Sequence, residues 1–149
     1  MLRLASENEV KLLTDMSKSA FDSDIEFGSN GIGPTGFDSY DWHAERQKEN
    51  SLYSFEVEGK VVGGAVLHKD DKKVFVHRIF IDVNQFCKGY GSALMRAIEE
   101  NYEDVDVFTL DTPEWNCRTN SFYKKCGYVE FGKEHTPNFD LVLYEKRIK

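Results

Sequence analysis

The stretch from Val74 to Tyr102 constrains the fold more than any other part of the chain. Its first third, 74–83, is rich in β-branched and aromatic residues, which predicts a largely buried strand. Its last third, 93–102, has apolar residues at helical spacing. A short loop with glycines at Gly89 and Gly91 joins the two. This order is typical of an anion-binding site, because glycines let the backbone approach a phosphate and the first N–H groups of a helix lack internal partners.

A second motif runs from Asn116 to Tyr128 and reads Asn-Cys-Arg-Thr-Asn-Ser-Phe-Tyr-Lys-Lys-Cys-Gly-Tyr. In this order, the two motifs resemble those of the GNAT superfamily of N-acetyltransferases. That family has Q/R-x-x-G-x-G/A after a strand and, later, roughly N-x-x-A-x-x-F-Y-x-K-x-G-F. The resemblance covers most of the chain from about residue 51 onward. The matching residues of the second motif are Asn116, Phe122, Tyr123, Lys125, Gly127 and Tyr128, with Thr119 where alanine is usual.

The resemblance implies a GNAT-like fold in a single domain over 1–149. Such a fold is a mixed α/β structure with a mostly antiparallel sheet of about six to seven strands, about four helices and splayed central parallel strands. The residue patterns themselves indicate a layered α/β domain with hairpins on the N-terminal side and a parallel crossover at the centre. A helix should begin at Ser6, where Glu9 completes a capping box, and end near Phe21. Other predicted elements are a strand over 2–5, a glycine-rich loop over 22–36, a helix over 39–50, strands over 52–57 and 61–68 around a turn, a charged turn over 69–73, a strand over 106–110, a loop over 111–115, a helix over 116–127, and strands from 128 and over 139–144 before a charged tail.

Composition limits the partners. The formal net charge of −7 argues against a nucleic-acid backbone, which requires a basic surface, and is compatible with a cationic acceptor such as an amine. A solvated acidic surface would give the same charge. No apolar run is long enough to span a bilayer, and the N-terminus lacks a secretion signal, so we expect a cytoplasmic protein with no membrane partner. Three cysteines without metal-ligand spacing predict reduced thiols and no metal site.

As a GNAT-like protein, the chain should use acetyl-CoA as its acetyl donor. Phe86 stands where the family has Gln or Arg, and because a phenyl ring cannot hydrogen-bond a phosphate, the backbone N–H groups of the loop would hold the pyrophosphate. The amide-rich arm of the cofactor would pair with an open strand edge. Asn116 would either hydrogen-bond this arm or cap its own helix. The predicted cofactor-binding residues are Ile79, Phe80 and Ile81 at the edge, Phe86, Cys87, Lys88, Gly89, Tyr90, Gly91 and Ser92 in the loop, and Asn116 and Tyr123 in the second motif.

Direct transfer to an amine in a ternary complex is what the resemblance implies, with Tyr123 as the acid that protonates the leaving thiolate. An alkylammonium has a pKa of about 10.4, so it must first lose a proton. His77, on the central strand, is a candidate base because of its titration range. Glu26 and Asp22 on the N-terminal loop are rivals, as are Asp111 and Glu114, and a water chain would also serve.

The acceptor site should lie between the first two predicted helices and the end of the chain. The aromatic residues Phe27, Phe37, Tyr40 and Trp42 are candidates for its wall, although such residues are also typical of a core. The acceptor would be a small-molecule amine or a peptide or protein amine, and a homodimer is common in such a family. An alternative function is a non-catalytic acyl-CoA sensor or interaction module. A third interpretation, an α/β domain without a coenzyme A site, would require both motifs to be coincidental.

Overall fold

A computed structural model describes residues 1–24 and 33–148 of the chain. It contains a seven-stranded sheet in the order β1-β2-β3-β4-β5-β7-β6. Every neighbouring pair is antiparallel except β4 and β5. The elements are β1 (Leu2–Leu4), the 3-10 helix η1 (Glu7–Glu9), α1 (Val10–Asp22), α2 (Tyr40–Lys48), β2 (Leu52–Val57), β3 (Lys60–Asp70), β4 (Lys73–Ile81), η3 (Val83–Gln85), α3 (Tyr90–Glu100), β5 (Val107–Pro113), α4 (Cys117–Lys125), β6 (Val129–His135) and β7 (Asp140–Arg147).

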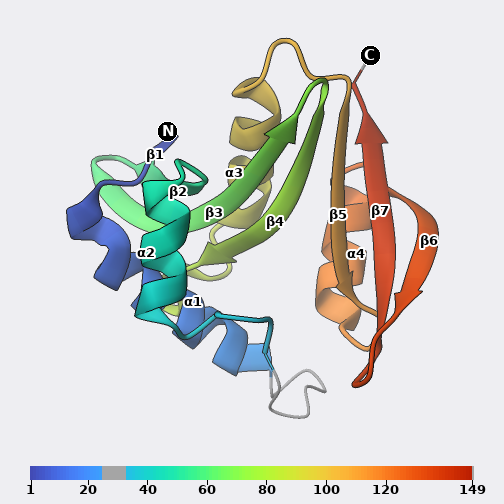
Figure 1. The fold of residues 1–149 in the computed structure, drawn as a ribbon, viewed down its shortest axis with the longest axis horizontal. Coiled ribbons are helices and arrows are strands. Elements are labelled where there is room, and N and C mark those ends of the chain that lie inside the picture. The colour runs from blue at the N-terminus through green and yellow to red at the C-terminus, as the bar shows by residue number, and fades with distance from the viewer. Residues whose placement is uncertain (25–32, 149) are drawn as a thin grey trace.

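The sheet separates two helical layers, with α1 and α2 in front of it and α3 and α4 behind it in the view of Figure 1. Helix α1 packs its buried face, including Leu13, against Val66 and Phe80 of the sheet. On the other face, α3 buries Leu94, Met95 and Ile98. Both layers follow from sequence periodicity, because each helix has one apolar stripe and must bury it against the sheet.

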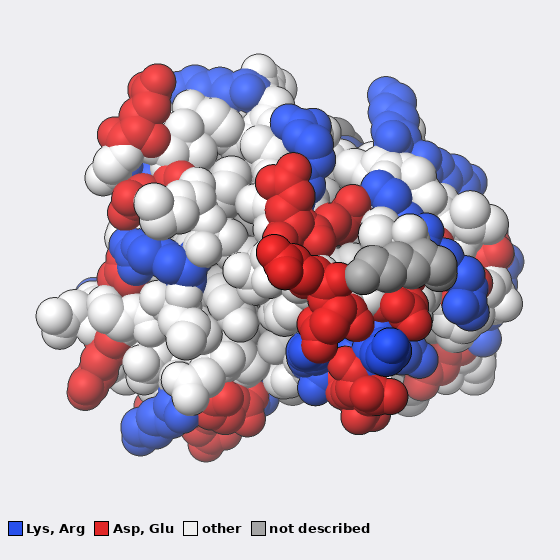
Figure 2. All heavy atoms as spheres, turned by 90° about the horizontal axis from the view of Figure 1, so that it is seen from above, with Lys and Arg blue, Asp and Glu red and all other residues white. Residues whose placement is uncertain are grey.

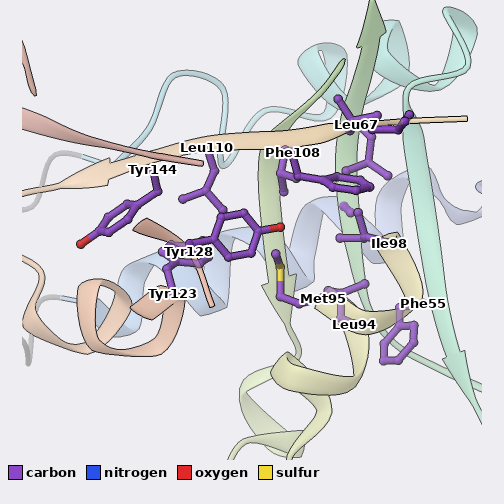
Figure 3. Packing of buried hydrophobic residues seen from close by; sticks show 14 of the residues in the cluster. Phe55, Leu67, Leu94, Met95, Ile98, Phe108, Leu110, Tyr123, Tyr128 and Tyr144 are labelled. Carbon is purple, nitrogen blue, oxygen red and sulfur yellow. The ribbon is translucent and has the colours of Figure 1, made fainter. Parts of the chain in front are cut away.

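The larger core joins both halves of the sheet to α3 and α4. Figure 3 shows Leu94, Met95 and Ile98 of α3 near Phe108 and Leu110 of β5. Buried tyrosines extend this core toward β6 and β7. Their rings pack edge-on or tilted, with the Tyr123 centroid 6.2 Å from that of Tyr128 and 6.1 Å from that of Tyr144. The core therefore fixes α4, and with it the second sequence motif, under the C-terminal strands.

Strands β4 and β5 are paired only where they begin. Residues Lys73 to Phe75 pair in parallel with Val107 to Thr109, and the register continues no further. Figure 1 shows the two strands meeting at this end and then diverging. This divergence confirms the predicted splay, and it leaves one edge of β4 unpaired from Val76 onward.

Two irregularities adapt the strands next to this opening. The β3–β4 register changes between Val66 and Leu67, which pair with Arg78 and Val76, so His77 is an extra residue in a β-bulge. The second irregularity is at Gly63, where an added Cβ would lie 2.4 Å from the Phe80 carbonyl oxygen, so β3 and β4 approach each other closely there.

Several predicted boundaries are wrong by a few residues. Helix α3 begins at Tyr90 rather than after Ser92, because Gly89 takes a left-handed conformation (φ 78°) that lets the helix start at once. Asp111 lies in β5 rather than in a loop, and β7 continues to Arg147 rather than ending at Tyr144, because these two strands pair along their whole length. Strands β3 and β4 also extend into the predicted charged turn. The first hairpin strand, Leu52–Val57, has the predicted boundaries.

Acidic side chains form a band across the end of the molecule seen in Figure 2. The β3–β4 turn and the α3–β5 connection lie at this end, and the exposed carboxylates there include Asp70, Asp71, Glu103 and Asp104. The loop after β4 lies at the other end of that strand, away from the band. Within 1–24 and 33–148, no helix is long and apolar enough to cross a membrane.

Candidate active site

The loop after β4 lies at the end of that strand where β4 and β5 have diverged. A single 3-10 turn, η3, follows β4 and is capped by Asp82, whose carboxylate accepts the N–H of Asn84 at 3.1 Å. The chain then passes through two left-handed residues, Cys87 (φ 65°) and Gly89 (φ 78°), before α3 begins. Because α3 starts at Tyr90, its first turn contains the motif residues Gly91 and Ser92.

The N–H groups from Cys87 to Ser92 donate no hydrogen bond to any residue that the structure describes. The first N–H of α3 with an internal partner belongs to Ala93, which donates to the Gly89 carbonyl at 3.2 Å. Of these six N–H groups, those of Tyr90, Gly91 and Ser92 belong to the first turn of α3, where the helix dipole adds a partial positive charge. This arrangement suits a multiply charged anion.

Gly91 also explains how the two sequence motifs meet. A Cβ added there would lie 3.3 Å from two carbons of the Phe122 ring, which belongs to α4. The N-terminal turn of α3 therefore packs closely against α4. Lys88 is exposed, and its ammonium donates to the Gln85 side chain at 3.0 Å, so one cation borders the loop without entering it.

Phe86 has a structural role that the motif did not predict. Its ring packs partly against the core under α1. The Arg118 guanidinium of α4 lies 5.7 Å from the centre of this ring and forms an ion pair with Asp24. Burial raises the pKa of Asp24, whereas Arg118 and Asn116, which interact with its carboxyl, lower it. Sequence analysis missed Asp24 and Arg118, because only the fold brings the end of α1 beside α4.

The predicted cofactor edge, Ile79 to Ile81, is open on the side that faces β5. Within the part of the chain that the structure describes, these residues pair only with β3, through Ala65, Gly64 and Gly63. Phe80 points into the core under α1, whereas Ile79 and Ile81 pack on the α3 side. Free backbone groups along this edge can pair with an extended amide chain as another strand would.

Asn116 caps α4. Its side-chain oxygen accepts the N–H of Thr119 at 3.1 Å, and the residue is only 2% exposed. The capping alternative is therefore confirmed, and a contact with the cofactor arm stays a prediction. Thr119, which replaces the usual alanine, shares a hydrogen bond of 2.6 Å with the hydroxyl of Thr112 on β5. The substitution therefore adds a polar contact between α4 and the sheet.

Tyr123 lies in the larger core, 8% exposed. Its hydroxyl makes no hydrogen bond to the described residues, and it is not among the fully buried polar atoms that lack a partner. Burial raises the pKa of this phenol, and the negative charge of Asp111 adds to the shift. The hydroxyl therefore stays protonated at neutral pH, with its proton free for a ligand.

His77 faces the α2 side of the sheet. Its Nδ1 lies 3.2 Å from Nε2 of His68, and its ring meets that of Trp42 edge-on at 5.6 Å between centroids. Burial lowers the pKa of His77 to about 4, and the charge of Arg78 contributes. The imidazole is therefore neutral at physiological pH, and it is a weak base.

The other candidate bases separate into two groups. Asp22 and Glu114 form surface ion pairs, with Lys18 at 2.7 Å and Lys133 at 2.8 Å, and the structure does not bring them to the opening. Asp111 lies on β5 beside the opening, where burial and the nearby Glu134 raise its pKa. Glu26 falls outside the described residues.

The aromatic wall is only partly as expected. Trp42 of α2 reaches the opening, where it contacts both His77 and Arg78. Phe37 instead packs edge-on against Phe21 of α1 at 6.1 Å, and Tyr40 is half exposed at 50%. Phe27, like Glu26, lies outside the described residues. Sequence analysis did not consider Arg78, although a charged residue within an apolar strand was a signal for it.

Comparison with known proteins matches residues 18–128 to the model of the acetyltransferase (GNAT) family. The chain belongs to the GNAT family of acetyltransferases. This GNAT protein is 28% identical over 145 residues to the uncharacterized protein YrkN of Bacillus subtilis (strain 168). The aligned region covers 93% of this chain and 78% of YrkN.

Solved GNAT structures share the fold. A GNAT-family acetyltransferase from Streptococcus agalactiae 2603 superimposes with a TM-score of 0.86 at 18% identity, over 100% of this chain and 95% of that one. The PaiA N-acetyltransferase from Thermoplasma acidophilum, in complex with coenzyme A, gives a TM-score of 0.79 at 16% identity, over 99% and 98% of the two chains. The predicted GNAT fold is therefore confirmed. In this GNAT protein, the loop motif follows β4 and precedes α3, as the resemblance implied.

Proposed function

We propose that the protein transfers the acetyl group of acetyl-CoA directly to an amine in a ternary complex. The observation that carries the proposal is the run of unpartnered N–H groups from Cys87 to Ser92, next to the unpaired edge of β4. A pyrophosphate needs clustered donors, and an amide-rich arm needs an open strand edge. Both lie on one path from the start of α3 into the opening between β4 and β5.

The loss of Gln or Arg at Phe86 removes a side-chain donor from the loop but none of its backbone donors. Because Phe86 packs against α1, it anchors the loop on the side away from α3. We therefore assign diphosphate binding to the main chain from Cys87 to Ser92. The ammonium of Lys88 would add charge at the exposed rim.

Acetyl transfer needs a base for the attacking amine and an acid for the leaving thiolate. The amine nitrogen bonds to the thioester carbonyl carbon, the carbon–sulfur bond breaks, and the nitrogen loses a proton while the sulfur gains one. We assign the acid to Tyr123, whose hydroxyl is protonated at neutral pH and has no partner among the described residues, so it can donate to the leaving sulfur. His77 and Asp111, which lie on the parts of β4 and β5 beyond their mutual pairing, are our candidates for taking the amine proton, directly or through water.

The substitution Tyr123→Phe tests the acid assignment. We expect turnover to fall tenfold or more while the affinity for coenzyme A changes little, because the ring and its packing remain. Turnover is measured by thiol release with an amine that the wild-type protein acetylates, and affinity by calorimetry.

Tyr128→Phe is the matched control. Tyr128 is also buried, at 2% exposed, but its hydroxyl donates to Glu99 of α3 at 3.1 Å. This variant should keep wild-type turnover. Unchanged turnover in Tyr123→Phe would refute the acid role. Coenzyme A binding, with no thiol released from acetyl-CoA in the presence of any amine, peptide or aminoglycoside, would instead favour a non-catalytic module.

A further inference from the structure

Arg78 lies on the α2 side of β4, in the part of the strand beyond its pairing with β5. It follows the bulge at His77 and shares a face of β4 with Phe80, two residues on. On β5, Thr109 is the last residue paired with β4, and Asp111 is the next residue on the same face. Continuing the register by two residues therefore brings Asp111 level with His77 and Arg78 across the gap.

The Arg78 side chain is positively charged and has no ion-pair partner among the described residues. None of its nitrogens makes a hydrogen bond or an ion pair with the residues in 1–24 or 33–148, and Nη1 is buried without a partner. Burial lowers the pKa of Arg78 to about 10, and the charge of Asp111 across the gap opposes this effect. Arg78 as a whole is half-buried, but a buried guanidinium nitrogen without a partner is costly, and native proteins rarely leave one without a ligand or an ion.

Trp42 holds Arg78 in place. The Arg78 guanidinium carbon lies 4.8 Å from the centre of the indole ring, and that of Arg46 lies 5.0 Å from it. The two arginines differ in charge balance, because Nε of Arg46 is 2.6 Å from a carboxylate oxygen of Glu49. Of these two arginines, only Arg78 lacks a carboxylate in direct contact among the described residues.

We infer that Arg78 binds the carboxylate of the acceptor while Asp111 faces the acceptor's amine, so that the preferred substrate is a small amino acid-like zwitterion. The inference rests on the proposed function and specifies its substrate class. A planar guanidinium matches a planar carboxylate in a two-bond geometry. An opening that presents a cation on β4 and an anion on β5 complements a molecule carrying both charges, whereas a simple alkylamine leaves Arg78 unpaired.

The first test compares acceptors in pairs, each amino acid against its carboxamide and its decarboxylated amine. Thiol release is measured with saturating acetyl-CoA. We expect kcat/KM to be at least about tenfold higher for the carboxylate members, as for a charge-assisted hydrogen bond. Equal values across the pairs, or a preference for aminoalkylphosphonates over amino acids, would overturn the inference and leave the transferase function intact.

The second test substitutes Arg78→Met, with Arg46→Met as the matched control. We expect Arg78→Met to raise the KM of the carboxylate acceptor about tenfold or more. The KM of the carboxamide acceptor and the KM of acetyl-CoA should stay unchanged. Arg46→Met removes an arginine from the same indole and should keep the preference. If Arg78→Met lowers kcat/KM equally for all acceptors, or raises the KM of acetyl-CoA, the assignment is contradicted.

Two further measurements keep the inference testable. If Arg78→Met does not fold, Arg78→Lys keeps the charge but loses the planar fork, and it should reduce the preference for carboxylates severalfold without abolishing it. An unchanged preference in Arg78→Lys would count against the inference. Calorimetry of the acceptor against the protein–coenzyme A complex should show binding that Arg78→Met abolishes. If coenzyme A binds but no amine is acetylated, the proposed function fails, and this inference fails with it.

Discussion

Gly89→Ala tests the role of the loop most sharply, because the chain contains a matched control. Gly89 and Gly59 have nearly the same left-handed φ, 78° and 79°, and a Cβ added to either would meet nothing within 4 Å. Alanine at either position therefore adds backbone strain without a steric clash. The cost is about 1 to 2 kcal/mol for an L-residue in this conformation. The two variants should lose similar stability, measured by urea unfolding.

Only Gly89→Ala should weaken the binding of coenzyme A. Gly89 precedes the first turn of α3, so a rotation that relieves its strain also redirects the N–H groups of Gly89 and Tyr90. When coenzyme A binds, these N–H groups must return to their original direction, and the free-energy cost is at most the strain that the rotation relieved. A cost of about 1 to 2 kcal/mol corresponds to an affinity about 5- to 30-fold lower. Gly59 lies in the β2–β3 turn, and Gly59→Ala should bind coenzyme A as the wild type does. Equal affinities for both variants, measured by calorimetry, would refute the role of these N–H groups.

Two further predictions concern stability. Arg3 holds the Glu9 carboxylate through two bonds of 2.8 Å and lowers its pKa to about 2. Because the folded pKa lies below the unfolded value of 4.5, this stabilisation is present above pH 4.5 and is lost as the pH falls toward 2. Glu9→Gln should lower the free energy of unfolding by about 2 kcal/mol at pH 7, and urea titrations at decreasing pH should show the difference shrinking; a constant difference would contradict the linkage. Gly64→Ala places a Cβ 2.8 Å from the Tyr53 carbonyl oxygen, whereas the nearest atom to a Cβ at Gly132 is at 3.6 Å. Gly64→Ala should therefore cost about 1 to 3 kcal/mol, with little change in Gly132→Ala, by thermal unfolding; equal melting temperatures would disprove the close packing of β3.

The fold was predictable because its strongest local signals agree with one another. An apolar strand, two glycines and an amphipathic helix over 74–102 define the central crossover, and the second motif places α4. Boundaries were less predictable, because pairing partners set them. Asp111 looked like the start of a loop, yet β7 holds it in a strand.

The site was predictable where it depends on the main chain and not where it depends on tertiary contacts. Glycine spacing indicates the free N–H groups by itself, because glycines between a strand and a helix permit the left-handed turn that exposes them. Arg78 lacks any sequence motif, and its importance appears only once β4 and β5 diverge around it. The same holds for Asp24 and Arg118, which are separated by most of the chain but form an ion pair beside the loop.

Amide NMR spectra recorded while coenzyme A is added would show whether the N–H groups from Cys87 to Ser92 hold the diphosphate of the acetyl donor. The amide signals of Gly89, Tyr90, Gly91 and Ser92 should shift strongly on saturation, and these amides should become protected from hydrogen exchange. Binding that leaves these signals unmoved, or no binding at millimolar coenzyme A, would contradict the claim.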